Sequence, residues 1–158
     1  MASNPAASPR SPANQQLLNH QLCFAVYSTM LSLNKLYRGL LKDLEITYPQ
    51  YLVMMVVWEA DGMTVSQIGS RLFLDYPTLT PLLKRLERQG LLLRQRSSLD
   101  ERHVHIWLTD KGRALQHRAR HVPGCVAAAM SCSTESIASL RDELVELRTA
   151  VLHSTDGN

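Results

Sequence analysis

Residues 64–108 of this chain have the sequence TVSQIGSRLFLDYPTLTPLLKRLERQGLLLRQRSSLDERHVHIWL. Apolar residues recur at helical spacing on both sides of the tetrapeptide LDYP at 74–77, which is typical turn material. The pattern predicts two helices joined by a tight turn. The second helix should end at Gly90, because glycine tolerates the left-handed backbone that commonly follows a helix.

Two short strands are expected after the second helix. The segments 91–96 (LLLRQR) and 103–108 (HVHIWL) have strand-like patterns and are joined by the polar loop 97–102 (SSLDER). Two helices, a turn and a hairpin together form a winged helix-turn-helix, which places its second helix in the major groove of duplex DNA. The sequence therefore predicts a mostly α-helical fold with a small β-wing.

Basic residues concentrate in the same part of the chain. Residues 64–120 hold eleven Lys and Arg against five Asp and Glu, whereas the rest of the chain holds six against nine. Cations placed at phosphates release condensed counterions, so this segregation favours double-stranded DNA as a partner over an ordinary solvated surface, which mixes both signs. The candidate DNA-binding residues on the second helix, at its start and on the strands are Asp75, Tyr76, Thr78, Thr80, Lys84, Arg85, Arg88, Arg94 and Arg96.

Composition limits the class of protein. The chain has 158 residues, 45% of them hydrophobic, which is enough to bury one core. No apolar run approaches the roughly 20 residues that cross a bilayer, and the start lacks a signal peptide, so we expect a cytoplasmic protein without a membrane partner. Three cysteines are too few for a disulfide framework and should be free thiols.

A long helix is expected before the winged unit. Apolar residues recur at helical spacing over residues 17–44, which predicts one helix of about 27 residues, near 40 Å long. One face carries Cys23, Tyr27 and Tyr37. Tyr37 lies about 21 Å along the axis from Cys23, so only the antiparallel helix of a second copy could bring these two together. Alternatively, the tyrosines are ordinary core aromatics.

Two further helices flank the winged unit. Pro49 should end the first long helix or open a second one, which runs to about residue 58. Its residues 51–58 are apolar almost all round and should be buried, and Thr64 or its neighbour should cap the helix after it. Near the end of the chain, a heptad spacing of apolar residues predicts a dimerisation seam, formed by Ile137, Leu140, Leu144, Leu147 and Val151. This seam would pack against residues 17–44 of a second subunit or, alternatively, within its own chain.

Two cysteines lie between the wing and the seam. A helix after the wing should break or kink near Pro123, and Cys125 and Cys132 should follow on a short helical piece. His117, His121 and Cys125 have the spacing of metal ligands on one helix face, with Cys132 as a fourth ligand. Because Pro123 interrupts that face, we predict no metal site and no cofactor.

Four motifs carry a resemblance to a known family. They lie at 22–28 (LCFAVYS), 46–51 (ITYPQY), 79–86 (LTPLLKRL) and 100–102 (DER). Together they resemble the MarR family, and within it the OhrR class of repressors that sense organic hydroperoxides. The resemblance covers about 17–152. The DER motif is common in MarR proteins, whereas the Cys-Phe-x-x-Tyr and Thr-Tyr-Pro-Gln motifs are more specific.

The resemblance implies a homodimeric repressor, not an enzyme, that binds a pseudo-palindromic operator while it is reduced. Cys23 matches the peroxidatic cysteine of the class, and Tyr37 and Tyr48 match residues that hydrogen-bond its sulfur from the other subunit. Tyr27 matches a further aromatic residue near the thiol. Arg102 matches the wing-tip residue that enters the minor groove, where a narrow, negative channel favours a guanidinium.

Members of this class with two cysteines join the oxidised cysteine to a resolving cysteine of the other subunit. The usual resolving position falls near Ala128, between Cys125 and Cys132. Either cysteine is therefore a candidate. A mechanism with one protein cysteine and a small external thiol is the other option.

A sensor thiol has chemical requirements of its own. A thiolate attacks the distal oxygen of a hydroperoxide and becomes a sulfenic acid, so it needs a lowered pKa and an apolar approach. Phenol hydroxyls that donate to the sulfur of Cys23 would stabilise the thiolate. Leu22, Phe24, Met54 and Met55 are candidates to line the approach. A buried and inert Cys23 is the alternative.

The start of the second helix departs from the class. Its sequence is DYPT at 75–78, and Tyr76 has the reach to contact a phosphate or a base. Pro81 lacks the N–H that a helix interior needs, so it fits only if the helix begins close to Thr78.

The predicted organisation follows from these motifs. A disordered tail (1–15), rich in Ala, Ser and Pro, precedes one MarR-type domain (16–154), with dimerisation helices at 16–62 and 110–154 and the winged unit at 63–108. The predicted function is transcriptional repression, relieved when an organic hydroperoxide oxidises the N-terminal cysteine. The alternative is a MarR repressor released by a small aromatic ligand in the dimer cleft.

Overall fold

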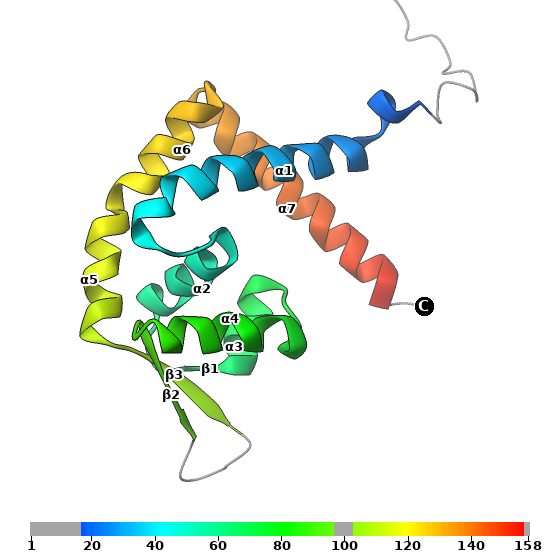
Figure 1. Cartoon of the computed structure of the whole chain (residues 1–158). Coiled ribbons are helices and arrows are strands. Elements are labelled where there is room, and N and C mark those ends of the chain that lie inside the picture. Colours follow the sequence, from blue (N-terminus) through cyan, green and yellow to red (C-terminus); the bar gives the residue numbers. More distant parts are fainter. Residues whose placement is uncertain (1–16, 97–102, 157–158) are drawn as a thin grey trace, which may run out of the picture.

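The computed structural model describes residues 17–96 and 103–156 and is mostly helical with one small sheet (Figure 1). Its elements in order are η2 (Leu18–His20), α1 (Leu22–Leu40), η3 (Lys42–Leu44), α2 (Tyr48–Glu59), β1 (Met63–Thr64), α3 (Val65–Leu72), α4 (Tyr76–Arg88), β2 (Leu92–Arg96), β3 (Val104–Leu108), α5 (Asp110–Arg118), η4 (Ala119–His121), α6 (Val122–Met130) and α7 (Thr134–Asp156). None of the described helices combines the length and the apolar character that a membrane span needs. The predicted tail (1–15) and the wing loop with Arg102 lie outside the described residues.

The predicted winged helix-turn-helix is confirmed. Helices α3 and α4 are joined by a short turn, and β2 and β3 form an antiparallel hairpin in which Leu92 lies opposite Leu108 and Arg96 opposite Val104. The two-residue strand β1, which the sequence did not predict, pairs with the other edge of β3. The sheet order is therefore β1-β3-β2, and the long hairpin extends away from the helices (Figure 1).

One hydrophobic core holds this unit against α2. The largest fully buried side chains in it come from α2, α3, α4 and the sheet: Val53, Met54, Val57, Ile68, Leu79, Leu83, Leu86, Leu92 and Ile106. Burial of each such side chain contributes about 1.5–3 kcal/mol. Because the apolar side of α4 is fixed in this core, its polar side must face outward.

Side-chain caps set where two of these helices begin. In α2, Gln50 accepts a hydrogen bond from the backbone N–H of Thr47 at 2.8 Å, and the two residues form a capping box with Pro49 in the first turn. Thr64 and Gln67 form the same arrangement at the start of α3. The predicted cap at Thr64 and the buried helix before it are confirmed.

The prediction of one helix over residues 17–44 is wrong. Gln21 has an extended backbone (φ −87°, ψ 119°), so it separates η2 from α1. Helix α1 has 19 residues, which corresponds to about 28 Å. Beyond it the chain makes the short turn η3 and reverses at Glu45, which is left-handed (φ 57°). Apolar spacing persists through these interruptions, and so it could not reveal them.

Helix α4 begins earlier than Pro81 led us to expect. The Asp75 carboxylate accepts the backbone N–H of Thr78 at 3.0 Å, and the helix starts at Tyr76. Pro81 therefore lies inside α4, and the expected start close to Thr78 is wrong. Because Pro81 has no backbone N–H, the carbonyl of Pro77 lacks the helical hydrogen bond that residue 81 would otherwise donate. Both proline rings are exposed, so the interruption lies on the solvent side of the helix.

The predicted kink after the wing is confirmed at η4, which separates α5 from α6. Pro123 is the second residue of α6, where a missing N–H costs nothing. Cys125 lies on α6 as predicted, but Cys132 does not. The helix ends at Met130 because Ser131 is left-handed (φ 51°), and Cys132 lies in the turn before α7.

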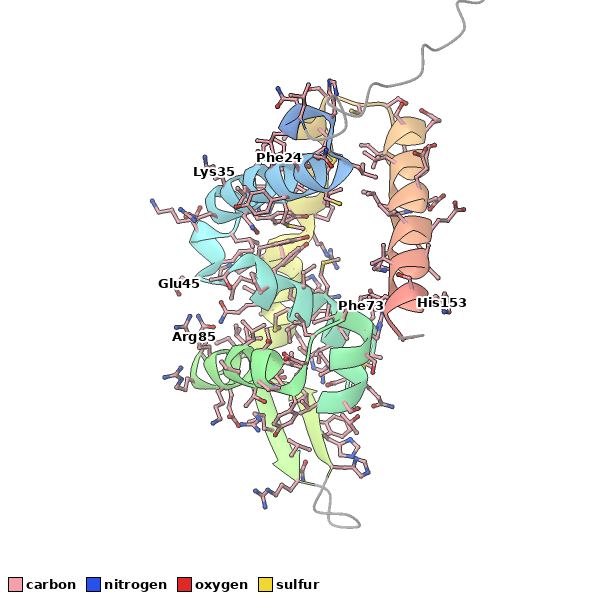
Figure 2. All side chains as sticks on the ribbon, turned by 90° about the vertical axis from the view of Figure 1, so that its right-hand side faces the viewer. Phe24, Lys35, Glu45, Phe73, Arg85 and His153 are labelled. Carbon is pink, nitrogen blue, oxygen red and sulfur yellow. The ribbon has the colours of Figure 1, made fainter. Side chains whose placement is uncertain are left out.

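Helix α7 stands beside the rest of the chain (Figure 2). Most of its predicted seam is exposed in the single chain, with Leu140, Leu144 and Val151 at 58%, 39% and 52% exposure, whereas Ile137 is half-buried. The Arg148 guanidinium lies 4.1 Å above the ring of Phe73, at the end of α3. The seam is therefore available to a second subunit.

Candidate functional site

The outward face of α4 carries most of the predicted DNA contacts. Lys84, Arg85 and Arg88 are exposed there, on the side opposite the core leucines, and Figure 2 shows Arg85 at the outer edge of the molecule. Tyr76 is 60% exposed in the first turn, and Arg96 is exposed at the end of β2. This arrangement of a cationic helix face beside a hairpin is the one that docks in a major groove.

Three other predicted DNA contacts are engaged within the chain. The hydrogen bonds from Thr78 hold the pKa of Asp75 below its usual range. The Thr80 hydroxyl donates to a carbonyl one turn earlier, at 2.8 Å. Arg94 lies 3.8 Å from Glu87, and 20% of its side chain is exposed. These contacts within the chain position α4 and β2. Contacts of the same three residues with DNA stay a prediction.

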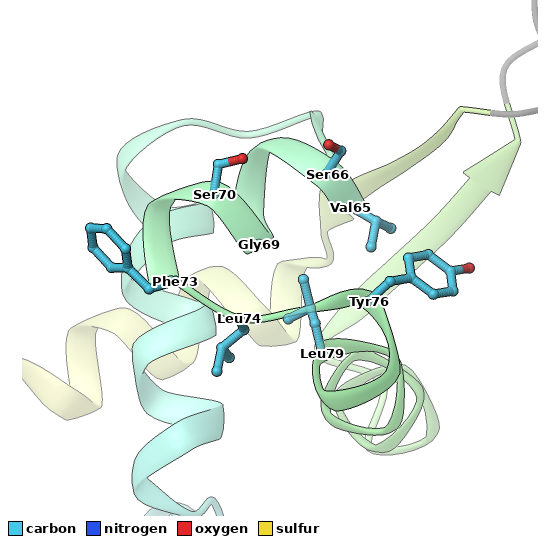
Figure 3. Close-up of a pocket in the computed structure, with 8 residues that line it drawn as sticks. All are labelled: Val65, Ser66, Gly69, Ser70, Phe73, Leu74, Tyr76 and Leu79. Carbon is cyan, nitrogen blue, oxygen red and sulfur yellow. The ribbon is translucent and has the colours of Figure 1, made fainter. Parts of the chain in front are cut away.

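A pocket of about 350 Å³ lies at the turn between α3 and α4 (Figure 3). It is lined by Val65, Ser66, Gly69, Ser70, Phe73, Leu74, Tyr76 and Leu79. Figure 3 shows the ring of Tyr76 extending outward beside Val65, from the start of the α4 helix. Because all of these residues come from the helix-turn-helix, the pocket belongs to the unit that would face DNA.

Cys23 is the second residue of α1, and its thiol is exposed. It lies among exposed apolar side chains of the same helix, with Val26, Tyr27 and Met30 at 41%, 60% and 45% exposure. Burial of Cys23, the first half of the alternative, is therefore wrong for the single chain, whereas the reactivity of the thiol stays a prediction. The sulfur can meet a solute or a second subunit.

Tyr37 and Tyr48 come together although α1 and α2 carry them separately. Their rings stack with centroids 3.9 Å apart, and the ring of Tyr51 lies 6.1 Å from that of Tyr37. Burial, followed by the neighbouring phenols of Tyr48 and Tyr51, raises the pKa of Tyr37 to about 12, and burial also raises the pKa of Tyr51. These two phenols therefore stay protonated at neutral pH and can donate hydrogen bonds. Tyr27 lies outside this cluster.

The raised pKa of Tyr37 makes stability depend on pH in a defined window. An unfolded tyrosine ionises near pH 10, whereas folded Tyr37 does so near 12, so its contribution is complete below pH 10 and is lost between pH 10 and 12. We expect the unfolding free energy of wild type to fall more steeply in this window than that of Tyr37→Phe. Chemical denaturation across the pH series measures the difference. The expectation fails if an absorbance titration shows that folded Tyr37 ionises near pH 10.

An apolar pocket of about 220 Å³ adjoins the tyrosine cluster. It is lined by Tyr37, Tyr51, Met55, Pro123, Val126, Ala127, Met130 and Ile137, from α1, α2, α6 and α7. Met55, one of the residues expected to line the approach to the thiol, lines this pocket, but Cys23 does not, so the role of Met55 stays a prediction. Met54 is wrong for this role, because it is fully buried in the core. Leu22 is exposed and Phe24 is half-buried on α1, and neither residue lines this pocket.

The other two cysteines are exposed free thiols. Cys125 lies in the first turns of α6, and Cys132 lies in the following turn with its sulfur 3.1 Å from the carbonyl oxygen of Met130. Within residues 17–96 and 103–156, no group of three or more His, Cys, Asp or Glu side chains is arranged to hold a metal ion.

Sequence reasoning missed two residues that connect elements. Asp61 accepts hydrogen bonds from the backbone N–H groups of Gly62 and Leu108, and it pairs with Arg113 at 2.7 Å. Trp58 donates its indole N–H to the carbonyl of Gly112 at 3.0 Å. No sequence pattern signals either contact, because their partners are about 50 residues away. The Thr47 cap could have been found from its Thr-x-x-Gln spacing.

Comparison with known proteins identifies relatives along nearly the whole chain. Residues 35–118 match the family model of the transcriptional regulators SarA/Rot. The regulator TtmR of Methylorubrum extorquens is 48% identical over 90% of this chain and 73% of its own length. The organic hydroperoxide resistance transcriptional regulator of Bacillus subtilis is 44% identical over 82% of this chain and 88% of its own.

A solved structure agrees with these relatives. Reduced AbfR bound to DNA, a protein of Staphylococcus epidermidis, superposes with a TM-score of 0.75, is 33% identical and covers 89% of this chain and 98% of its own. These relatives are transcriptional regulators rather than enzymes, as predicted for this chain. The chain therefore belongs to the MarR family of winged helix-turn-helix transcriptional regulators, in the OhrR-like group that these relatives represent.

Proposed function

We propose that this chain is a homodimeric repressor that binds a pseudo-palindromic operator while Cys23 is reduced and releases it when an organic hydroperoxide oxidises that thiol. The observation that carries the proposal is the position of Cys23, exposed in the first turn of α1 on an apolar face. The name of the Bacillus subtilis relative, at 44% identity, supports the same class of oxidant.

The DNA side of the proposal rests on α4 and the wing. Lys84, Arg85 and Arg88 on the exposed face of α4 would enter the major groove, and Arg96 with the wing loop would follow the adjacent minor groove. Two copies related by a two-fold axis would place their α4 helices about one DNA turn apart, roughly 34 Å. A pseudo-palindromic operator is the corresponding target.

The dimer side rests on two exposed apolar surfaces. Apolar side chains of the α7 seam and of the α1 face that carries Val26 and Met30 are exposed to solvent in the single chain, within the described residues. We assign both surfaces to the dimer interface, so residues 16–62 and 110–154 would dimerise while 63–108 read DNA. Mutual burial of such surfaces is a sufficient driving force for association.

The thiol site requires the second subunit. Tyr37 lies fourteen positions after Cys23 on the same helix, which is about 21 Å along the axis. An antiparallel α1 of the partner would bring the partner subunit's Tyr37, with its stacked Tyr48, to the sulfur. Protonated phenols donate hydrogen bonds, and they would stabilise the thiolate form of Cys23.

The proposed chemistry is balanced by the hydroperoxide itself. The Cys23 thiolate attacks the distal oxygen of ROOH, forms an S–O bond and expels alkoxide, which takes a proton to give ROH. The sulfenic acid then reacts with the thiol of Cys125 or Cys132 of the partner subunit, forming a disulfide and releasing water. Each step changes the sulfur group that the partner subunit's phenols contact. It can therefore shift the dimer away from the spacing of its two α4 helices that fits both half-sites of the operator.

The direct test follows thiols and operator affinity together. Reduced protein is titrated with cumene hydroperoxide while free thiols are counted and operator binding is measured by fluorescence anisotropy. We expect operator affinity to fall in proportion to the fraction of Cys23 that is oxidised. Non-reducing electrophoresis should show a covalent dimer that is lost in one of the two variants, Cys125→Ser and Cys132→Ser, and kept in the other. Operator affinity that stays constant while Cys23 is fully oxidised would refute the proposal and favour release by a bound ligand instead.

A further inference from the structure

A continuous set of aromatic rings from α1 and α2 links the tyrosine cluster to the last turn of α2. We call Tyr37, Tyr48, Tyr51 and Trp58 the aromatic column. The Tyr37 and Tyr48 rings stack at 3.9 Å, the Tyr37 and Tyr51 rings lie 6.1 Å apart, and the Tyr51 and Trp58 rings meet edge to face at 6.0 Å. Tilted and edge-to-face pairs about 6 Å apart attract one another, and the Tyr37 and Tyr48 rings are in direct contact, so the column is a packed unit.

The far end of the column is tied to α5. The half-buried indole of Trp58 donates its N–H to the carbonyl oxygen of Gly112 at 3.0 Å. Gly112 lies in the first turn of α5, where its own N–H is bound by the hydroxyl of the capping residue Thr109. Since Trp58 is part of helix α2, this hydrogen bond joins α2 directly to the first turn of α5.

The first turn of α5 also contacts the segment between α4 and β2, residues 89–91, which we call the wing base. A Cβ atom on Gly112 would lie 2.2 Å from the carbonyl oxygen of Leu91, so the two backbones are in close contact. Thr109 donates its backbone N–H to the Leu91 oxygen at 3.2 Å, and its hydroxyl donates to the neighbouring carbonyl of Gly90 at 2.6 Å. The Lys111 ammonium donates to the carbonyl of Gln89 at 2.7 Å. These contacts leave the end of α4 and the start of β2 little freedom to move without α5.

We propose that Trp58 is a positioning residue that couples the thiol site to the DNA-reading unit, through its hydrogen bond to Gly112. This inference rests on the proposed function, because it assumes that oxidation disturbs the phenols of Tyr37 and Tyr48. A displaced tyrosine pair shifts α2, and Trp58 passes the shift to α5 and the wing base. Asp61 adds a second link to β3 and α5, but it lies beyond the last residue of α2.

The first test compares two tryptophan variants. Trp58→Phe keeps an aromatic ring and removes the N–H, whereas Trp107→Phe makes the same change outside the column, on β3. The measured quantity is the ratio of operator dissociation constants, oxidised over reduced, within each protein, so changes in basal affinity cancel. We expect Trp107→Phe to keep the wild-type ratio and Trp58→Phe to reduce it about fivefold, the factor that corresponds to one ordinary hydrogen bond.

The second test needs no change to Trp58. The chain has two tryptophans, so in Trp107→Phe the remaining emission comes from Trp58 alone. We expect that emission to shift when Cys23 is oxidised, and to stay constant in a Trp107→Phe protein that also carries Cys23→Ser. An unchanged Trp58 emission, or an unreduced ratio in Trp58→Phe, overturns the coupling role. If wild type itself keeps its operator when oxidised, the proposed function fails instead, and this inference with it.

Discussion

A Cys23→Ser protein is expected to bind its operator and to stay bound when an organic hydroperoxide is added. Cys23 is exposed and makes no core contact, so an isosteric hydroxyl leaves the fold intact. Serine lacks the polarisable sulfur that attacks the peroxide bond, and so the trigger is removed while every DNA contact remains. Operator binding by fluorescence anisotropy, with and without cumene hydroperoxide, measures the effect.

The size of the effect follows from population shift. A hundredfold loss of operator affinity in the oxidised wild-type dimer corresponds to about 2.7 kcal/mol of difference between the two states. We expect a loss of that order in wild type and less than about twofold in Cys23→Ser.

The matched controls are the other two exposed cysteines. Cys125→Ser and Cys132→Ser, made singly, retain the peroxidatic thiol and should still release operator, although one of them should lose the covalent dimer. Release of Cys23→Ser by peroxide would contradict the sensor role of Cys23. In that case oxidation at another site, or binding of the peroxide itself, must move the winged unit.

The winged unit could be predicted from sequence because its signals are local. Helical periodicity, a Pro-containing turn and two strand patterns within 45 residues define it, and Thr64 caps α3 as expected. The errors lie where backbone geometry is set by one residue. The extended Gln21 shortens α1, and the Asp75 cap starts α4 at Tyr76 rather than close to Thr78. Apolar spacing contains no information about such single positions.

The candidate site was less predictable because its contacts join distant segments. Helical spacing placed Cys23 and Tyr37 on one face, and the resemblance gave them their roles and added Tyr48. The stacking of the two tyrosines, however, depends on how α1 packs on α2. Arg94 illustrates the same limit, since its contact with Glu87 arises only when β2 folds beside α4. From its charge alone, Arg94 was predicted to contact DNA together with the exposed cations of α4.

Placing an arginine in the middle of the α7 seam is expected to convert the protein to a monomer and to abolish tight operator binding. Leu144 is 39% exposed in the single chain, so Leu144→Arg should fold normally. In a two-fold interface each substitution occurs twice, and each removes about 1.5–3 kcal/mol of apolar burial and adds a charge that must be desolvated. Size-exclusion chromatography with light scattering measures the oligomeric state.

Loss of the dimer lowers operator affinity through geometry rather than through any DNA contact. A monomer binds one half-site and loses the effective concentration that the second subunit supplies, so we expect operator affinity to fall by about 10²–10⁴. Glu146→Gln is the matched control, because it changes the charge of the same helix by the same amount at an exposed position off the seam. If Leu144→Arg stayed dimeric with unchanged operator affinity, the seam would not lie in the dimer interface, and α1 would have to supply the symmetry contact alone.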